Sequence, residues 1–170
     1  MFRQSGQFAA AAMLIAALCA PAQAREAVAF QPGVEPGTIV IVTHERRLYY
    51  VYEPGAAIRY PVGVGKAGKQ WRGVSRIDGK YVNPAWTPPP DVRRDNPTMP
   101  VVIPGGSPRN PMGVAALTLE GDQYAIHGTT QAMRKSVGTF ASYGCIRMLN
   151  EDITDLYQRV AVGTPVVVVP

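Results

Sequence analysis

The sequence predicts a mostly β domain with one or two short helices. Of its 170 residues, 17 are glycine, 16 are proline and 46% are hydrophobic. This hydrophobic content is sufficient for a packed core, whereas glycine and proline in this abundance favour a turn-rich β fold over a bundle of helices. Short runs of β-branched and apolar residues alternate with turn residues, which is typical of strands.

The first 24 residues have the pattern of an export signal, and we expect a signal peptide over residues 1–24. Arg3 supplies a positive charge, an apolar run extends from Phe8 to Leu18, and Ala22-Gln23-Ala24 provides the small residues that precede a cleavage site. The alternative is an uncleaved membrane anchor, for which this run is short.

Cleavage before Arg25 would leave Cys145 as the one cysteine of the mature chain, because Cys19 would leave with the signal. A single cysteine cannot close an internal disulfide. A free thiol in an oxidising compartment is a chemical liability, so it usually marks a reactive site. The alternative is a small buried hydrophobic residue.

The formal net charge of +5 sets expectations about partners. A basic exported protein is unsuited to meet nucleic acid, whereas the carboxylates of cell-wall polymers and anionic membrane surfaces would attract it. A charge that only maintains solubility explains the same number.

The N-terminal half of the mature chain is expected to contain a short tether followed by strands. Residues 25–37 include two prolines and two glycines without periodicity, which indicates a tether rather than packed structure. Strands are expected at Thr38–Thr43, Leu48–Tyr52 and Ile58–Val64.

A proline-rich segment divides the domain. Nine of the sixteen prolines lie between Pro84 and Pro111. Proline cannot donate a hydrogen bond to a sheet, so this segment should be loop and extended chain. Apolar anchors such as Trp86 and Met99 indicate an ordered loop, which we expect to form a lid or a wall of a substrate groove.

The C-terminal part combines strands with one amphipathic helix. We expect strands at Gly113–Glu120, Tyr124–Gly128 and Val166–Val169. Asn150 is a suitable N-cap for a helix between the last two strands. That helix would bury one face, which consists of Ile153, Leu156, Tyr157 and Val160.

Cys145 and His127 are the residues best suited to chemistry. A thiol becomes a strong nucleophile when a base or a positive charge favours its thiolate. Histidine titrates near neutral pH, so it can take the thiol proton and pass it to a leaving amine. His127 ends an expected strand, and the chain between the two residues is long enough to return Cys145 to its side.

The neighbours of Cys145 suggest how a reaction would be supported. Gly144 permits a tight turn, so the backbone amides from Tyr143 to Cys145 could converge as an oxyanion hole. Arg147 lies two residues beyond the thiol and, in an extended segment, would share its face. Each feature has an ordinary structural explanation, and Ser136 and Ser142 would by default be turn hydroxyls. Their combination within residues 127–147 favours a catalytic site.

These residues resemble the catalytic motif of the L,D-transpeptidase family. The matching stretches are His127-Gly128-Thr129, Ser136-Val137-Gly138 and Ser142-Tyr143-Gly144-Cys145-Ile146-Arg147-Met148 with Asn150. Further similar segments lie at residues 61–66, 83–88, 110–113 and 163–167, so the resemblance covers about residues 38–170. It implies a β-sandwich-like catalytic domain in the periplasm that acts on peptidoglycan stem peptides.

The resemblance also implies a mechanism. Cys145 would attack the bond between a meso-diaminopimelate-type residue and D-alanine, and His127 would take the thiol proton. The Gly128 carbonyl would orient the imidazole, and the Gly144 amide would belong to the oxyanion hole. D-Alanine would leave, and an amine of a second stem would complete a 3→3 cross-link. The residues expected on the substrate side are Arg147, Ser142, Tyr143, Thr129 and Ser136.

We expect no metal or other cofactor, and a monomer is the default for the oligomeric state. A second class of acceptor stays open, an outer-membrane protein or lipoprotein. The chain departs from the family pattern at two places. Tyr143 stands where many members have histidine, and Gln70-Trp71-Arg72-Gly73 stands where the family tends to have a Thr-Pro-x-Gly turn. Both departures concern substrate recognition rather than the nucleophile.

Other functions remain open at this stage. Water in place of an amine would make the protein an L,D-carboxypeptidase, and cleavage of a wall-anchored protein would make it a hydrolase. A papain-like endopeptidase is disfavoured because its cysteine precedes its histidine. A non-catalytic wall-binding module would not need the thiol. With two histidines and one mature cysteine, the chain has no ligand cluster with metal-binding spacing.

Overall fold

The computed structural model describes residues 25–31, 33–121 and 124–170. The expected signal peptide, residues 1–24, lies outside the described residues. Among the helices in the described ranges, none has the length and apolar character needed to cross a bilayer.

Within these ranges, nine strands are hydrogen-bonded side by side in one sheet, which the long strand β6 (Gly73–Val82) divides into two halves. Residues 73–76 of β6 pair with β11, and residues 77–82 pair with β7 after a register shift. The bounds of the other strands of this sheet are β1 Glu26–Ala29, β2 Ile39–Val42, β3 Arg47–Glu53, β4 Ala56–Pro61, β7 Ala115–Leu119, β8 Ala125–His127, β10 Ile146–Arg147 and β11 Pro165–Val169. The strands β5 (Val64–Gly65) and β9 (Phe140–Ser142) pair separately.

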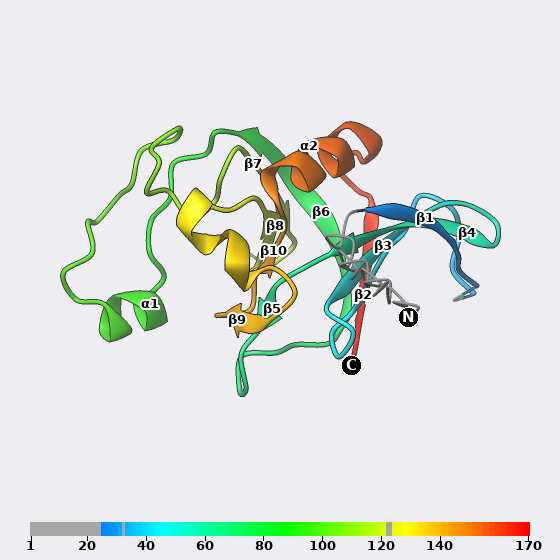
Figure 1. Cartoon of the computed structure of the whole chain (residues 1–170), viewed down its shortest axis with the longest axis horizontal. Helices are drawn as coiled ribbons and strands as arrows, with labels where there is room; N and C mark the ends of the chain where they lie inside the picture. Colours follow the sequence, from blue (N-terminus) through cyan, green and yellow to red (C-terminus); the bar gives the residue numbers. More distant parts are fainter. Residues whose placement is uncertain (1–24, 32, 122–123) are drawn as a thin grey trace, which may run out of the picture.

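Three short helical segments accompany the strands in the described part of the chain. They are α1 (Pro90–Asp95), the 3-10 helix η1 (Gln131–Ser136) and α2 (Asn150–Arg159). Figure 1 shows β1 to β4 at one end of the molecule and α1, carried by the proline-rich loop, at the other. The predicted mostly β fold is confirmed, with two short α-helices and the additional 3-10 turn.

The helix α2 packs one face against β7 and β8 and closes the core. Its Ile153 and Leu156 are fully buried, together with Leu117 and Ile126 of the two strands. Burial of side chains of this size contributes about 1.5–3 kcal/mol each relative to exposure. The face predicted from the sequence is therefore the face that packs.

The start of α2 differs from the prediction. Asn150 is the first helical residue, and Leu149 precedes it without a side-chain cap. The Asn150 side chain instead accepts hydrogen bonds from the amides of Thr129 (3.0 Å) and Val114 (3.4 Å). Asn150 therefore ties the helix to the loop that follows β8.

The expected tether also differs, because part of it belongs to the sheet. β1 pairs antiparallel with β4, and Glu26 forms an ion pair with Arg59. The Phe30 ring then stacks on Tyr49 with a centroid separation of 4.1 Å. β1 thus covers the edge of β4, which would otherwise leave unpaired backbone groups. Four residues beside prolines and glycines are too short a pattern to predict as a strand.

One partly buried hydrogen bond outside the site connects α2 to the sheet. Tyr60 of β4 is fully buried, and its hydroxyl donates to the Asp155 carboxylate of α2 at 2.6 Å. Tyr60→Phe should lower the free energy of unfolding by about 1–3 kcal/mol, because a charged acceptor loses its buried donor. Urea unfolding would show a lower midpoint at an unchanged slope. Tyr52→Phe, on an exposed side chain, is the matched control and should change nothing. Equal stability of both variants would contradict the assigned role.

Candidate active site

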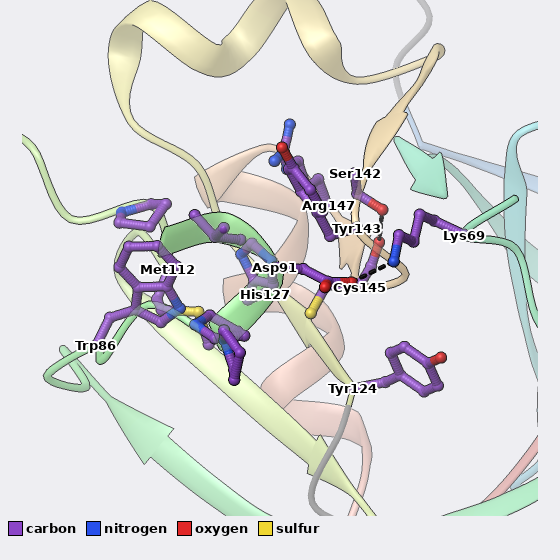
Figure 2. Close-up of a pocket in the computed structure, with 14 residues that line it drawn as sticks. Lys69, Trp86, Asp91, Met112, Tyr124, His127, Ser142, Tyr143, Cys145 and Arg147 are labelled. Carbon is purple, nitrogen blue, oxygen red and sulfur yellow. Dashed lines mark hydrogen bonds and ion pairs between the residues drawn. The ribbon is translucent and has the colours of Figure 1, made fainter. Parts of the chain in front are cut away.

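A cavity of about 460 Å³ lies where the proline-rich loop faces the strands β8 and β10. Figure 2 shows Cys145, His127 and Arg147 around it, with Trp86 and Met112 to one side and Lys69 and Tyr124 to the other. The residues that the sequence predicted as nucleophile and base are therefore brought together in one cavity.

The parallel pairing of β8 with β10 places these three side chains on one face. Arg147 pairs with His127, and Ile146 pairs with Ile126. Side chains along a strand alternate between faces, so Cys145, two residues before Arg147, shares the face of Arg147 and hence of His127. This register explains why the thiol and the imidazole line the same cavity.

His127 is held in one orientation by its own backbone neighbour. Its Nδ1 lies 2.7 Å from the Gly128 carbonyl, which can only accept, so Nδ1 carries the proton and Nε2 is the unprotonated nitrogen of the neutral ring. The Asn150 side chain accepts a hydrogen bond from this loop, and a side chain at Gly128 would overlap the Asn150 amide oxygen. The expected role of the Gly128 carbonyl thus agrees with the geometry.

Burial favours the neutral forms of both His127 and Cys145. Desolvation lowers the pKa of His127 to about 4, the positive charge of Arg147 adds to this effect, and the Gly128 and Pro111 carbonyls oppose it. Desolvation raises the pKa of the Cys145 thiol, against the Ala125 backbone and Arg147, which favour the thiolate. The free site therefore contains a thiol and a neutral imidazole rather than an ion pair.

The turn over residues 142–145 is held by the Ser142 hydroxyl. Its Oγ accepts from the Gly144 amide at 3.0 Å and donates to the Cys145 carbonyl at 2.6 Å. The Gly144 amide, expected in the oxyanion hole, is therefore already engaged, and the amides of Tyr143 and Cys145 are the ones left to converge on a substrate oxygen. Gly144 itself adopts a φ of 124°, and a side chain there would overlap the Tyr124 ring.

Arg147 brings a partly buried positive charge to the cavity. One of its terminal nitrogens lies 3.4 Å from the Ser136 hydroxyl, and no carboxylate pairs with it among the described residues. Its buried Nε has no hydrogen-bond partner in that part of the chain. Desolvation lowers the pKa of Arg147. A guanidinium in this situation suits a planar anionic group such as a carboxylate.

The remaining predicted site residues divide into two groups. Ser142 and Tyr143 line the cavity, whereas Thr129 and Ser136 do not. Thr129 is buried beside the His127 loop, where its amide donates to Asn150. Ser136 contacts Arg147 from the end of η1. Both therefore contact the groups that support the cavity rather than its interior.

The proline-rich segment forms one wall of the cavity, as the sequence analysis expected. Trp86 and Met112 line it, as does the start of α1. Two carboxylates of α1 hold this wall against the rest of the site. Asp91 pairs with Lys69, and Asp95 accepts from the Tyr143 hydroxyl at 2.7 Å and lies 3.8 Å from Lys66.

Sequence reasoning missed Lys69, Asp91 and Tyr124, because charged and aromatic residues in loops have no periodicity that marks them. Within the described ranges, no group of three or more histidine, cysteine or acidic residues is placed to hold a metal ion.

The comparison with known proteins agrees with this geometry. Residues 36–168 match the model of the YkuD family, described as the L,D-transpeptidase catalytic domain. A relative from Escherichia coli K12, "Probable L,D-transpeptidase YbiS", is 41% identical over 138 residues, which cover 75% of this chain and 43% of the relative. The chain spans less than half the length of the first curated relatives that it matches.

Solved structures share the fold. The "Ldtfm-avibactam carbamoyl enzyme" superposes with a TM-score of 0.63 at 18% identity, over 81% of this chain and 50% of that one. A "Probable carnitine operon oxidoreductase caia from Brucella melitensis" is 40% identical with a TM-score of 0.56, over 85% of this chain and 92% of that one. The name of that protein describes another class of reaction, whereas the family match takes in nearly all of the described residues. The chain belongs to the L,D-transpeptidase catalytic domain family.

Proposed function

We propose that this chain is an exported enzyme that cross-links peptidoglycan stem peptides in the periplasm through a thioester on Cys145. The observation that carries the proposal is the shared cavity of Cys145 and His127, in which the imidazole Nδ1 is bound to the Gly128 carbonyl. Residues 1–24 would deliver the domain across the membrane as a signal peptide. The acceptor would be an amine of a neighbouring stem, with an outer-membrane protein or lipoprotein as the alternative acceptor.

The first half of the reaction forms the thioester. Neutral His127 takes the Cys145 proton on Nε2 as the sulfur attacks the carbonyl of the residue before D-alanine. The amides of Tyr143 and Cys145 would stabilise the oxyanion of the tetrahedral intermediate. When the C–N bond breaks, the imidazolium returns the proton to the leaving D-alanine amine.

The second half transfers the acyl group. The acceptor amine attacks the thioester carbonyl, loses a proton to His127 and forms the new amide bond, and the Cys145 thiol is restored by that proton. Water in place of the amine would release a free carboxylate and make the enzyme a carboxypeptidase. Both outcomes use the same nucleophile and base, so only the products separate them.

Arg147 would hold an anionic group of the donor substrate. A meso-diaminopimelate-type residue has a carboxylate at the far end of its side chain, and Arg147 is a partly buried cation without a carboxylate partner among the described residues. A bound carboxylate would compensate its desolvation. This pairing would align the substrate carbonyl with the thiol.

A product assay tests the reaction. Purified protein without residues 1–24 should convert disaccharide-tetrapeptide into dimers that have lost one D-alanine, as read by mass spectrometry. Cys145→Ala should form none, since it removes the nucleophile. Loss of D-alanine without dimers would support the carboxypeptidase instead. Dimers formed equally by the variant would overturn the thioester mechanism.

The acylation rate should remain high in mild acid. His127 acts as a base only when neutral, and its pKa of about 4 keeps it neutral where an ordinary histidine would be protonated. Acylation by a carbapenem should therefore fall less than about twofold between pH 7.5 and 5.5, whereas a histidine with a pKa of 6.5 would lose roughly tenfold.

A control variant tests whether a second titratable group, with a pKa in the same pH range, contributes to the profile. Burial raises the pKa of Asp152 to about 6, and this residue lies on α2 outside the cavity lining. Asp152→Asn should leave the pH profile of acylation unchanged. A loss with a midpoint near 6.5 in both proteins would contradict the assignment of a neutral, buried base.

A further inference from the structure

We propose that Trp71 is a positioning residue that orients the backbone amide of Cys145 toward the substrate oxyanion. The inference rests on the proposed thioester mechanism, because only an acyl-transfer reaction needs that amide. Trp71 stands in one of the two places where the sequence departs from the family pattern. It does not line the catalytic cavity, so its effect has to pass through the residues that it touches.

The contact that carries the proposal is a hydrogen bond to the catalytic turn. The indole Nε1 of Trp71 donates to the Gly144 carbonyl at 3.0 Å. This carbonyl and the Cys145 amide belong to one planar peptide group, which is trans, as are all the described peptide bonds. In a trans peptide the C=O and N–H bonds point in opposite directions, so a donor that holds the carbonyl on one side directs the N–H to the other.

This arrangement would direct the Cys145 amide toward the catalytic cavity. Trp71 borders a second hollow and not the catalytic cavity, and Tyr124 lines both. The Cys145 amide, directed away from Trp71, then faces the side on which Cys145 lines the catalytic cavity. A preorganised donor of this kind stabilises the charge that develops on the substrate oxygen without reorganisation during the reaction.

The indole itself is held by stacking. The Trp71 and Tyr124 rings lie parallel, with an interplanar angle of 3° and centroids 5.0 Å apart. The Tyr124 ring covers the open face of Gly144, where a side chain would overlap it. The two rings and the glycine therefore form one packed unit beside the turn, which limits the positions that the indole Nε1 can take relative to the carbonyl.

The other hydrogen bonds of the turn do not hold this peptide group, so its orientation depends on Trp71. Ser142 binds the Gly144 amide and the Cys145 carbonyl, which are the groups on either side of the peptide in question. Among the described residues, the indole is the donor found on the Gly144 carbonyl. Without it the Gly144–Cys145 peptide could rotate between its fixed neighbours, and the Cys145 amide would lose its direction.

The test separates orientation of the amide from support of the thiol. Trp71→Phe keeps an aromatic ring on Tyr124 and removes the N–H donor. Two reactions of Cys145 are then compared with wild type, namely acylation by a carbapenem, which passes through an oxyanion, and alkylation by iodoacetamide, which displaces iodide in one step and forms none. Incorporation of 3-benzothienylalanine at position 71, which replaces the N–H by sulfur, retains the full ring size if the smaller ring lowers stability.

Both replacements should slow acylation by about 10- to 100-fold, somewhat less than the loss of a whole oxyanion donor, and leave alkylation within about twofold. Equal acylation rates would overturn the proposal, and a parallel fall of both rates would show a structural role instead. Wild-type protein that is alkylated but never acylated would refute the thioester mechanism itself, which distinguishes that failure from a failure of the role of Trp71.

Discussion

The parallel pairing of β8 with β10 is the constraint on which the rest of the site depends. It lies at the edge of the nine-stranded sheet and consists of two residue pairs, Ile146 with Ile126 and Arg147 with His127. So short a pairing is weak alone, but β8 also pairs with β7, and β10 is bonded to Gly63 on its other side. Arg147 exchanges backbone hydrogen bonds of 2.8 Å with Gly63, and the Met148 amide donates to the His127 carbonyl at 2.8 Å. The reactive face is therefore defined by backbone bonds before any side chain contributes.

The electrostatics of the site follow from that placement. The strand ends that are covered by α1 and the proline-rich wall have little access to water. Desolvation therefore disfavours the charged form of each titratable side chain there. His127 and Cys145 respond by remaining neutral, whereas Arg147 remains charged and lacks a carboxylate in the described part of the chain. In the unfolded chain the histidine pKa is near 6.5. Stability is therefore lost as the pH falls from that value toward 4, because the unfolded state binds the proton first.

The sequence was sufficient to select the two candidate residues that the fold brings to one cavity, and insufficient for the contacts that hold them. Cys145 and His127 could be predicted because their chemistry requires particular residue types, and the strand that ends at His127 was visible as an apolar run. The hydrogen bond of the Gly144 amide could not be predicted, since the Ser142 hydroxyl reaches it only in the folded turn. Asn150 is a similar case, because a local cap and a bond to the distant Thr129 amide use the same side-chain oxygen.

Tyr143, one of the departures from the family pattern, contacts a segment that is distant in the sequence, the helix α1 in the cavity wall. Where many family members have histidine, Tyr143 donates its hydroxyl to Asp95 of α1, and its ring faces Lys66 at 3.9 Å from the centroid. Lys66 also lies near Asp95, so Tyr143, Asp95 and Lys66 each contact the other two. All three are at least partly exposed, and exposed ion pairs contribute little energy individually. Three weak contacts that share partners nevertheless limit the motion of α1 relative to the turn. Tyr143 thus links the cavity wall formed by α1 to the turn that contains Gly144 and Cys145.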